Sequence, residues 1–302
     1  MSRKIPTKFG RYKLLNAVCR SQYSVIVSAI DPMTREKVIA KVIDMEIIPR
    51  QEVEIETSIM DRINHRYVMK LIRAVDDSGY RAIIMRTANM GDLEMAVREK
   101  ALNSLGMCAR IMYRIVLGIR YLHNKKILHG DIKPANVLLF RVTKEDIKPA
   151  ITDFGLSTLL NESSICKCNR GTCSFSAPEL LNRKPHSYPS DIWSLGATFY
   201  YMMTGSTVYP HIPFESLRTI VYTKRPMYQG GLFENAPIAL INLIDSMMST
   251  DPNDRPSIHG CLESQFFDTM LDKEFLEKEK IEEMMSPNIN GNDILTETKY
   301  HV

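Results

Sequence analysis

A short loop, His129–Asn136, constrains this chain more than any other stretch, and the apolar run Val137–Leu139 follows it. The loop carries an aspartate, a lysine two residues later and an asparagine five residues after the aspartate. Such spacing lets one tight loop direct three side chains at a single phosphoryl-transfer centre. Asp131 would orient a hydroxyl and accept its proton, Lys133 would neutralise charge, and Asn136 would hold a metal ion. A proline-containing surface turn after a helix is the alternative, and the surrounding sequence decides between them.

Length and composition predict a large globular protein. The chain has 302 residues, 44% of them hydrophobic, which is enough for one two-lobed domain or two ordinary domains. A net charge of +4 without a Lys/Arg block does not predict nucleic-acid binding. No stretch approaches the roughly 18 apolar residues of a membrane span, and the N-terminus lacks a signal-peptide core. We therefore expect an intracellular, cytoplasmic protein, with the nucleus left open, no membrane or nucleic-acid partner, and a monomer by default.

Six cysteines lie scattered along the chain, at positions 19, 108, 166, 168, 173 and 261. In an intracellular chain of this size, scattered cysteines predict reduced thiols. Cys166, Cys168 and Cys173 are close enough in sequence to suggest zinc, but they lack a fourth ligand at useful spacing. We expect free thiols there.

Hydrophobic periodicity predicts strands in the first part of the chain. From Tyr12 to Asp44 the apolar residues alternate or form short β-branched runs, which indicates antiparallel strands and includes a hairpin at Val18–Ile26. Alternation places Ile39 and Lys41 on one strand face. Further strands are expected at 68–71 and 82–85, before a break at 86–93.

Helical spacing appears in three later segments. The first is Glu56–His65 and the second is Ala101–His123, a long helix that leads to the loop. The third is 271–285, after which residues 286–302 are polar and contain Pro287 and Gly291.

Several short motifs follow the loop in a fixed order. They are Asp153-Phe154-Gly155, Ala177-Pro178-Glu179, Asp191-Ile192-Trp193 and Asp251–Pro256. Together with the loop they resemble the eukaryotic protein kinases, and the resemblance covers residues 12–268. It implies an α+β bilobal protein-kinase fold. The expected parts are an N-terminal extension (1–11), a small, mainly antiparallel β N-lobe with helix C (12–86), a hinge (about 86–90), a larger, mainly α C-lobe (91–268), and a C-terminal helix with a polar tail (269–302).

The resemblance assigns catalytic and metal-binding roles. Asp131, Lys133, Asn136 and Thr172 would be catalytic, and Asn136 with Asp153 would hold Mg²⁺. Lys133 and Thr172 match the serine/threonine branch, and the overall pattern looks like the calcium/calmodulin-dependent protein kinase-like group. Phe154 would be the apolar plug beside the metal site, and His129 would pack under it.

The resemblance also implies an ATP site. Lys41 would hold the α- and β-phosphates with Glu56 as its partner, whereas a surface lysine and a solvated helix glutamate are the alternative. Asp92 would face the ribose or a basic substrate residue, and it also begins a helix. The ATP-binding residues expected from the resemblance are Val18, Ile26, Ile39, Lys41, Glu56, Met85, Arg86, Ala88, Asp92 and Leu138.

Five positions in three regions depart from the family pattern. Cys19, Ser21 and Ser24 replace the glycines of the phosphate-covering hairpin, which reduces backbone freedom there. Ile39 stands where a small alanine is usual, so we expect weak or shifted ATP binding. Gly130 replaces the arginine that commonly pairs with an activation-segment phosphate, so phosphorylation at Ser163 or Ser164 should not act as a strong switch by that route.

Other residues are expected to support the large lobe. Asp191 should bond the backbone of the catalytic loop, and Arg255 should pair with Glu179 in the interior. Residues 272–283 hold six acidic and three basic side chains, which argues against calmodulin as a partner. Docking of the C-terminal helix on the large lobe is the preferred interpretation over autoinhibition.

The sequence therefore predicts a serine/threonine protein kinase that transfers the γ-phosphoryl of Mg·ATP to protein substrates. The alternative is a pseudokinase that acts as a scaffold, suggested by the missing glycines and by Ile39. A metabolite kinase on a related fold is a third interpretation. The chain keeps all six polar residues that the resemblance places in the active site: the three in the loop, and Lys41, Glu56 and Asp153. Their retention favours the enzyme.

Overall fold

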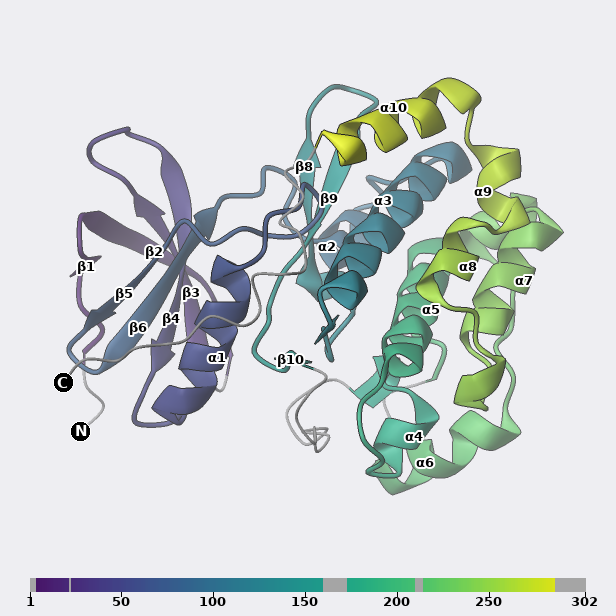
Figure 1. The fold of residues 1–302 in the computed structure, drawn as a ribbon, viewed down its shortest axis with the longest axis horizontal. Helices are drawn as coiled ribbons and strands as arrows, with labels where there is room; N and C mark the ends of the chain where they lie inside the picture. The colour runs from purple at the N-terminus through teal and green to yellow at the C-terminus, as the bar shows by residue number, and fades with distance from the viewer. Residues whose placement is uncertain (1–3, 22, 160–172, 210–213, 286–302) are drawn as a thin grey trace.

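The computed structural model describes residues 4–21, 23–159, 173–209 and 214–285. Figure 1 shows two lobes, a small one built on a sheet and a larger one built mostly of helices. This confirms the predicted α+β bilobal protein-kinase fold. Seven residues singled out in the sequence lie outside the described residues: Ser163, Ser164, Cys166, Cys168, Thr172, Pro287 and Gly291.

The small lobe is a six-stranded antiparallel sheet in the order β1-β2-β3-β4-β6-β5. Its strands are β1 (Lys8–Phe9), β2 (Tyr12–Arg20), β3 (Ser24–Ile30), β4 (Lys37–Asp44), β5 (Arg73–Asp77) and β6 (Tyr80–Arg86). The alternation expected from the sequence is present in β4, where Val38, Ala40 and Val42 are buried in the sheet's own core. Ile39 and Lys41 therefore share the opposite face, toward the second lobe.

Helix α1 (Arg50–Asp61) packs against the sheet and carries Glu56 on its buried side. It begins six residues before Glu56 and ends before His65, so the helix predicted from the apolar spacing is displaced toward the N-terminus. Arg62 then closes the helix through backbone hydrogen bonds.

The strand predicted at 68–71 is wrong. Only Val68 forms a bridge, and its partner is Ile151 in the other lobe. Met69 N–H donates to the Ile151 carbonyl at 2.7 Å, so this apolar run is a buried connection between lobes. A segment buried from two sides has a nearly continuous apolar sequence, as a fully buried strand does, and the sequence pattern alone does not distinguish the two.

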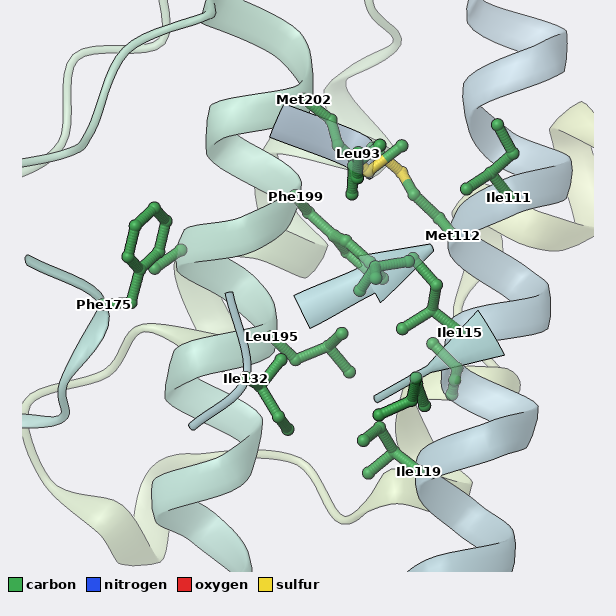
Figure 2. Packing of buried hydrophobic residues seen from close by; sticks show 14 of the residues in the cluster. Leu93, Ile111, Met112, Ile115, Ile119, Ile132, Phe175, Leu195, Phe199 and Met202 are labelled. Atoms are coloured by element: carbon green, nitrogen blue, oxygen red, sulfur yellow. The ribbon is translucent and has the colours of Figure 1, made fainter. Parts of the chain in front are cut away.

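The large lobe is built around two long helices. Its helices are α2 (Leu93–Arg98), α3 (Leu105–Asn124), α4 (Pro178–Leu181), α5 (Tyr188–Thr204), α6 (Phe214–Thr223), α7 (Ile238–Met247), α8 (Ile258–Leu262), α9 (Gln265–Met270) and α10 (Lys273–Met284). Figure 2 shows apolar side chains of α3 and α5 meeting in the lobe's core, with Ile115 facing Leu195 and Phe199. All three are almost fully buried.

Helix α3 begins at Leu105, four residues later than predicted. Ser104 adopts an extended backbone, and its hydroxyl accepts a hydrogen bond from Met107 N–H at 3.2 Å. A serine in this position caps the first turn, so the helix starts there. The following helical residues carry the chain to the catalytic loop as expected.

Short strands surround that loop. β7 (Ile127–Leu128) precedes it and pairs with β10 (Thr158–Leu159), while β8 (Val137–Arg141) follows it and pairs with β9 (Ile147–Ile151). The polar residues after Arg141 form the turn of this second hairpin. Because both pairs are antiparallel, the loop and the segment after Ile151 are brought together.

The C-terminal helix α10 lies across α3 and the β8–β9 hairpin, as Figure 1 shows in yellow. Leu271 and Phe275 are buried, and Phe275 packs edge-on against Tyr113 of α3, with ring centroids 6.0 Å apart. The prediction that this helix docks on the large lobe is confirmed.

Among the described residues, Cys19, Cys108, Cys173 and Cys261 form no disulfide. Within the residues that the structure describes, no helix has the length and apolar character needed to cross a membrane.

Candidate active site

The catalytic loop brings its three polar side chains together. Lys133 Nζ lies 2.6 Å from Asp131 Oδ2, and Asn136 Nδ2 donates to the same oxygen at 2.9 Å and to the Asp131 carbonyl at 2.8 Å. A short 3₁₀ turn, Pro134–Asn136, folds the asparagine back toward the aspartate. The Asp131 carboxylate is held in one orientation by two donors while remaining partly accessible to a substrate hydroxyl.

Asp191 at the start of α5 anchors this loop from below. Its carboxylate accepts the backbone N–H groups of His129 at 2.9 Å and Gly130 at 3.0 Å, as the sequence predicted. It also bonds His123 at 3.0 Å and His186 at 3.1 Å. Burial opposes ionisation, but the two imidazoles and these hydrogen bonds hold the pKa of Asp191 well below its usual range.

Gly130 occupies a place that few other residues could take. Its φ is +82°, in the left-handed region. A Cβ there would lie 2.8 Å from the Leu156 carbonyl oxygen and 3.1 Å from the His186 ring. The glycine and His186 therefore fill the space together, and the arginine common at this position would require both neighbours to move.

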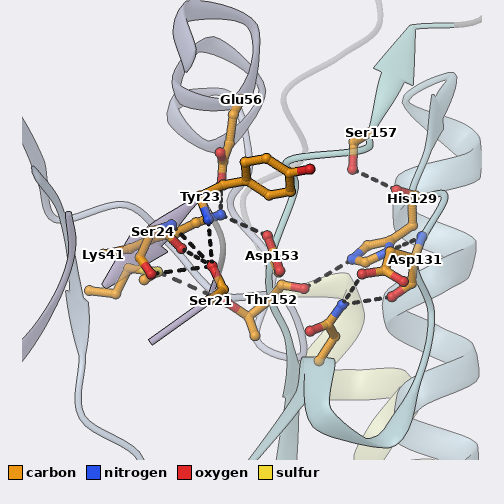
Figure 3. Close-up of polar contacts among 12 residues, drawn as sticks. Ser21, Tyr23, Ser24, Lys41, Glu56, His129, Asp131, Thr152, Asp153 and Ser157 are labelled. Carbon is orange, nitrogen blue, oxygen red and sulfur yellow. Dashed lines mark hydrogen bonds and ion pairs between the residues drawn. The ribbon is translucent and has the colours of Figure 1, made fainter. Parts of the chain in front are cut away.

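A second cluster lies across the cleft between the lobes. Lys41 Nζ is 2.7 Å from Glu56 Oε1 and 2.7 Å from Asp153 Oδ1, which joins β4, α1 and the segment after β9 (Figure 3). The lysine side chain is 13% exposed, so it is a buried cation with two anions and not a solvated surface lysine.

The charges in this cluster shift one another's ionisation. Lys41 is the main cause that holds the pKa of Asp153 at about 2. Burial favours neutral Lys41, but Asp153 and Glu56 outweigh it and raise the pKa of the lysine. Burial raises the pKa of Glu56 despite the neighbouring ammonium. The lysine thus remains protonated, ready to neutralise phosphate oxygens.

His129 and Phe154 connect the two clusters. Their rings meet edge to face with centroids 5.2 Å apart, and His129 Nε2 lies 3.1 Å from the Thr152 carbonyl oxygen. Phe154 is 1% exposed, and burial lowers the pKa of His129. The predicted packing of His129 under the phenylalanine is confirmed, and a neutral, buried imidazole is unsuited to serve as the base.

The oxygens around this junction fit a hard divalent cation. Asp153 is partly exposed on its carboxylate side and uses one oxygen for Lys41, while Asn136 donates through Nδ2, which leaves Oδ1 directed elsewhere. Magnesium is held by few protein oxygens together with substrate phosphates. No cluster of three His, Cys, Asp or Glu residues suited to a metal occurs in the described part of the chain. A metal here would therefore depend on Asn136, Asp153 and the nucleotide.

Four of the residues expected to bind ATP lie on strands β3, β4, β6 and β8. Ile39 is the strand partner of Met85 across β4 and β6, and Ile26 is the strand partner of Lys41 across β3 and β4. Ile39 and Leu138 are half-buried and pack against the large core cluster.

The remaining expected residues lie on β2, at the end of β6, in the hinge and at the start of α2. Val18 is 63% exposed on β2, and Arg86, at the end of β6, lies over the Phe140 ring at 5.1 Å. Ala88 follows in the hinge. Asp92 caps α2 by accepting Met95 N–H at 2.8 Å and forms a bridge with Leu138. The expected helix start at Asp92 is confirmed.

The structure adds a residue to which the sequence assigned no role. A cavity of about 200 Å³ lies between the lobes, lined by Tyr23 together with Lys41, Glu56, Asp131 and Asp153, among others. Figure 3 shows the Tyr23 ring directed into the cleft beside the cluster. Its position at the tip of the hairpin predicted at Val18–Ile26 is the sequence feature that could have pointed to this residue.

The serines that replace glycines stabilise the same tip. Ser21 Oγ accepts the Ser24 N–H at 3.0 Å and the Tyr23 N–H at 3.2 Å, and Ser21 N–H donates to the Ser24 carbonyl at 2.9 Å. These bonds occupy backbone N–H groups that a glycine-rich hairpin would offer to phosphates. The tip is thus closed by its own side chains.

Comparison of the sequence with known proteins finds similar serine/threonine and myosin light chain kinases. The chain is 26% identical over 262 residues to the serine/threonine-protein kinase H1 homolog of Pinctada fucata, covering 86% of this chain and 63% of that protein. It is 27% identical over 284 residues to human serine/threonine-protein kinase Nek5, covering 91% of this chain and 39% of that protein. It is 25% identical over 278 residues to myosin light chain kinase A of Dictyostelium discoideum, covering 88% of this chain and 94% of that protein.

The protein kinase domain family matches residues 12–267, which run from the start of β2 to within α9 and leave out β1 and α10. Because this match covers most of the sequence, this chain belongs to the protein kinase domain family.

Proposed function

We propose that this protein is an active serine/threonine kinase that transfers the γ-phosphoryl group of Mg·ATP to hydroxyls of protein substrates. Asp131 orients the hydroxyl and accepts its proton, and Lys133 neutralises charge on the transferred group. Lys41 holds the α- and β-phosphates, while Asn136 and Asp153 hold Mg²⁺, which neutralises charge on the phosphates when bound. The three relatives named above are all called kinases, and two of the names specify serine/threonine.

The observation that carries this proposal is the closed set of ion pairs across the cleft. Lys41 reaches both Glu56 and Asp153 at 2.7 Å, so the small lobe, α1 and the metal-binding segment are already in register. Positioning and charge neutralisation account for most of phosphoryl-transfer catalysis. We extend the proposal to the calcium/calmodulin-dependent protein kinase-like group, and to a cytoplasmic enzyme that is monomeric and independent of calmodulin.

The test is transfer of labelled γ-phosphate from Mg·ATP to pooled serine, threonine and tyrosine peptides. Asp131→Asn and Lys41→Met should each abolish transfer. Their matched controls are Asp61→Asn, an exposed carboxylate at the end of α1, and Lys37→Met, an exposed lysine on the same strand as Lys41. Both controls should transfer phosphate at the wild-type rate.

The same assay separates the proposal from a scaffold function. A folded wild-type protein that binds nucleotide but transfers nothing at millimolar ATP would be a pseudokinase. Transfer to tyrosine peptides only would contradict the serine/threonine assignment.

A further inference from the structure

Glu279 in α10 is a buried carboxylate outside the matched kinase domain. It is 1% exposed, although it belongs to a helix whose other charged residues are mostly solvated. Burying a carboxylate is costly unless it is paired and hydrogen-bonded. The residues that pair with Glu279 therefore show which elements α10 holds in place.

Three side chains meet Glu279 from two other elements. Arg114 of α3 donates from Nε to Oε1 at 2.9 Å, and the Tyr67 hydroxyl donates to Oε2. Arg66 lies 3.6 Å from the same Oε2. Burial and the Glu279 carboxylate raise the pKa of Tyr67, so its hydroxyl keeps its proton and remains a donor.

Further ion pairs fix α10 on both sides of Glu279. Arg66 pairs with Glu282, Arg120 with Glu283, and Arg110 with Asp272 at 3.2 Å. Arg114 also reaches the β8–β9 hairpin, at 2.5 Å from Asp146 Oδ1 and 2.8 Å from the Ile147 carbonyl oxygen. The helix thus joins α3, the hairpin and the loop after α1 at one point.

Tyr67 leads from this junction to the metal-binding segment. Its carbonyl accepts Ile151 N–H at 2.9 Å, and Met69 N–H donates to the Ile151 carbonyl at 2.7 Å. Ile151 ends β9 two residues before Asp153. Asp153 has little freedom relative to Ile151, because Thr152, the one residue between them, donates its N–H to the Asn136 carbonyl at 2.9 Å and Phe154 on the other side is buried.

The same loop also leaves α1, the helix that carries Glu56. Asn64 N–H donates to the Tyr121 hydroxyl at 2.9 Å, and His65 stacks on the Tyr121 ring with centroids 4.8 Å apart. The loop is therefore held to α3 at one end and to α10 at the other. The positions of Glu56 and Asp153, the two partners of Lys41, therefore depend on the position of this loop.

We propose that Glu279 is a positioning residue for phosphoryl transfer, which acts through Tyr67 on Ile151 and so on Asp153; this rests on the proposed kinase function. Helix α10 would then be an integral part of the active enzyme, not an appendage. An apolar face could dock a helix without the cost of a buried charge. The carboxylate instead sets one orientation of the tyrosine, and with it the register of the loop against β9.

The first experiment measures local order by amide hydrogen exchange in the full chain. Glu279→Gln removes the charge from the hydrogen bond with Tyr67, and Tyr67→Phe removes the bond itself, while both keep the side-chain shape. Exchange at Met69 and Ile151 should become about tenfold faster in both variants, while amides of α5 keep their wild-type rates. Glu277→Gln, an exposed glutamate on the same helix, is the matched control and should change nothing.

The second experiment measures catalysis in the same variants. Glu279→Gln and Tyr67→Phe should lower kcat by about tenfold and weaken Mg·ATP binding, with the KM for peptide unchanged. The double variant should be no worse than either single one, because both act through one bond. If the helix merely stabilises the fold, both variants should instead show faster exchange and lower stability throughout the chain, with kcat of the folded fraction unchanged.

Clear results would overturn the proposal. Unchanged exchange at Ile151 in both variants, or faster exchange confined to α10, contradicts the path from Glu279 to Asp153. If Glu279→Gln does not fold, Tyr67→Phe decides alone, since it keeps the carboxylate and its Arg114 partner. A wild-type protein that transfers no phosphate would refute the kinase function, while exchange and Mg·ATP binding would still decide the positioning role.

Discussion

The ion pair between Glu179 and Arg255 in the large lobe should be costly to break. Arg255 donates to both carboxylate oxygens, at 2.7 and 2.8 Å, and the two side chains are 0% and 7% exposed. The Arg255 guanidinium also lies over the Trp193 ring at 5.1 Å. Glu179 further accepts Ser190 Oγ–H at 2.9 Å. The predicted interior pair is therefore confirmed as a buried, two-pronged contact.

Glu179→Ala would leave the arginine buried without its counter-charge. Removal of one member of such a pair costs about 3–5 kcal/mol. Arg255 keeps two carbonyl acceptors, on Ser249 and Pro189, each at 2.8 Å. We therefore expect a loss near the lower limit, about 3 kcal/mol in the free energy of unfolding.

Equilibrium urea unfolding measures this loss. The fluorescence of Trp193, the only tryptophan, reports the unfolding, because its ring lies beside Arg255 of the pair. The matched control is Glu215→Ala, which breaks an exposed pair with Arg218 at 3.0 Å and should cost about 0.5 kcal/mol or less. The double variant Glu179→Ala with Arg255→Met should be less destabilised than the sum of the single variants. A Glu179→Ala loss no larger than that of the control, with an unchanged m-value, would refute the reasoning.

Three further predictions concern the active site and pH. Ile39→Ala should increase ATP affinity several-fold by calorimetry, because it enlarges the space beside Met85; equal affinities would contradict this. Gly130→Arg should lower stability and transfer rate in thermal melts and peptide assays, because the new Cβ would lie 2.8 Å from the Leu156 carbonyl oxygen, and a gain of activity would count against it. Burial opposes ionisation of Glu179, but Arg255 outweighs it and lowers its pKa below the ordinary 4.5. Its contribution to stability is therefore present above about pH 4.5 and is lost as the pH falls through the lowered pKa. The melting-temperature deficit of Glu179→Gln should shrink from pH 6 to pH 3, and a constant deficit would contradict this assignment.

Residue spacing within the catalytic loop was sufficient to predict that its three polar side chains meet. Asp131, Lys133 and Asn136 lie within one turn, so their mutual approach depends on local backbone geometry that the sequence encodes directly. Alternation in β4 likewise predicted that Ile39 and Lys41 share a face, since the side-chain period of a strand is two.

The sequence failed where burial came from distant elements. The apolar run at 68–71 has the composition of a strand, but it is buried because Ile151 and the large lobe cover it. The start of α3 was placed too early because apolar spacing continued past Ser104, where a side-chain cap decides the boundary.

Tertiary structure alone decided the role of α10. The sequence showed a charged helix and favoured docking, yet nothing in its spacing distinguished Glu279 from the exposed Glu277. Glu279 is buried because Tyr67 and Arg114, 212 and 165 residues away in the chain, converge on it. In the same way, the fit of Gly130 against His186 exists only once α5 lies beneath the loop. Local chemistry can be derived from neighbouring residues, whereas a buried charge depends on which distant partners the fold brings to it.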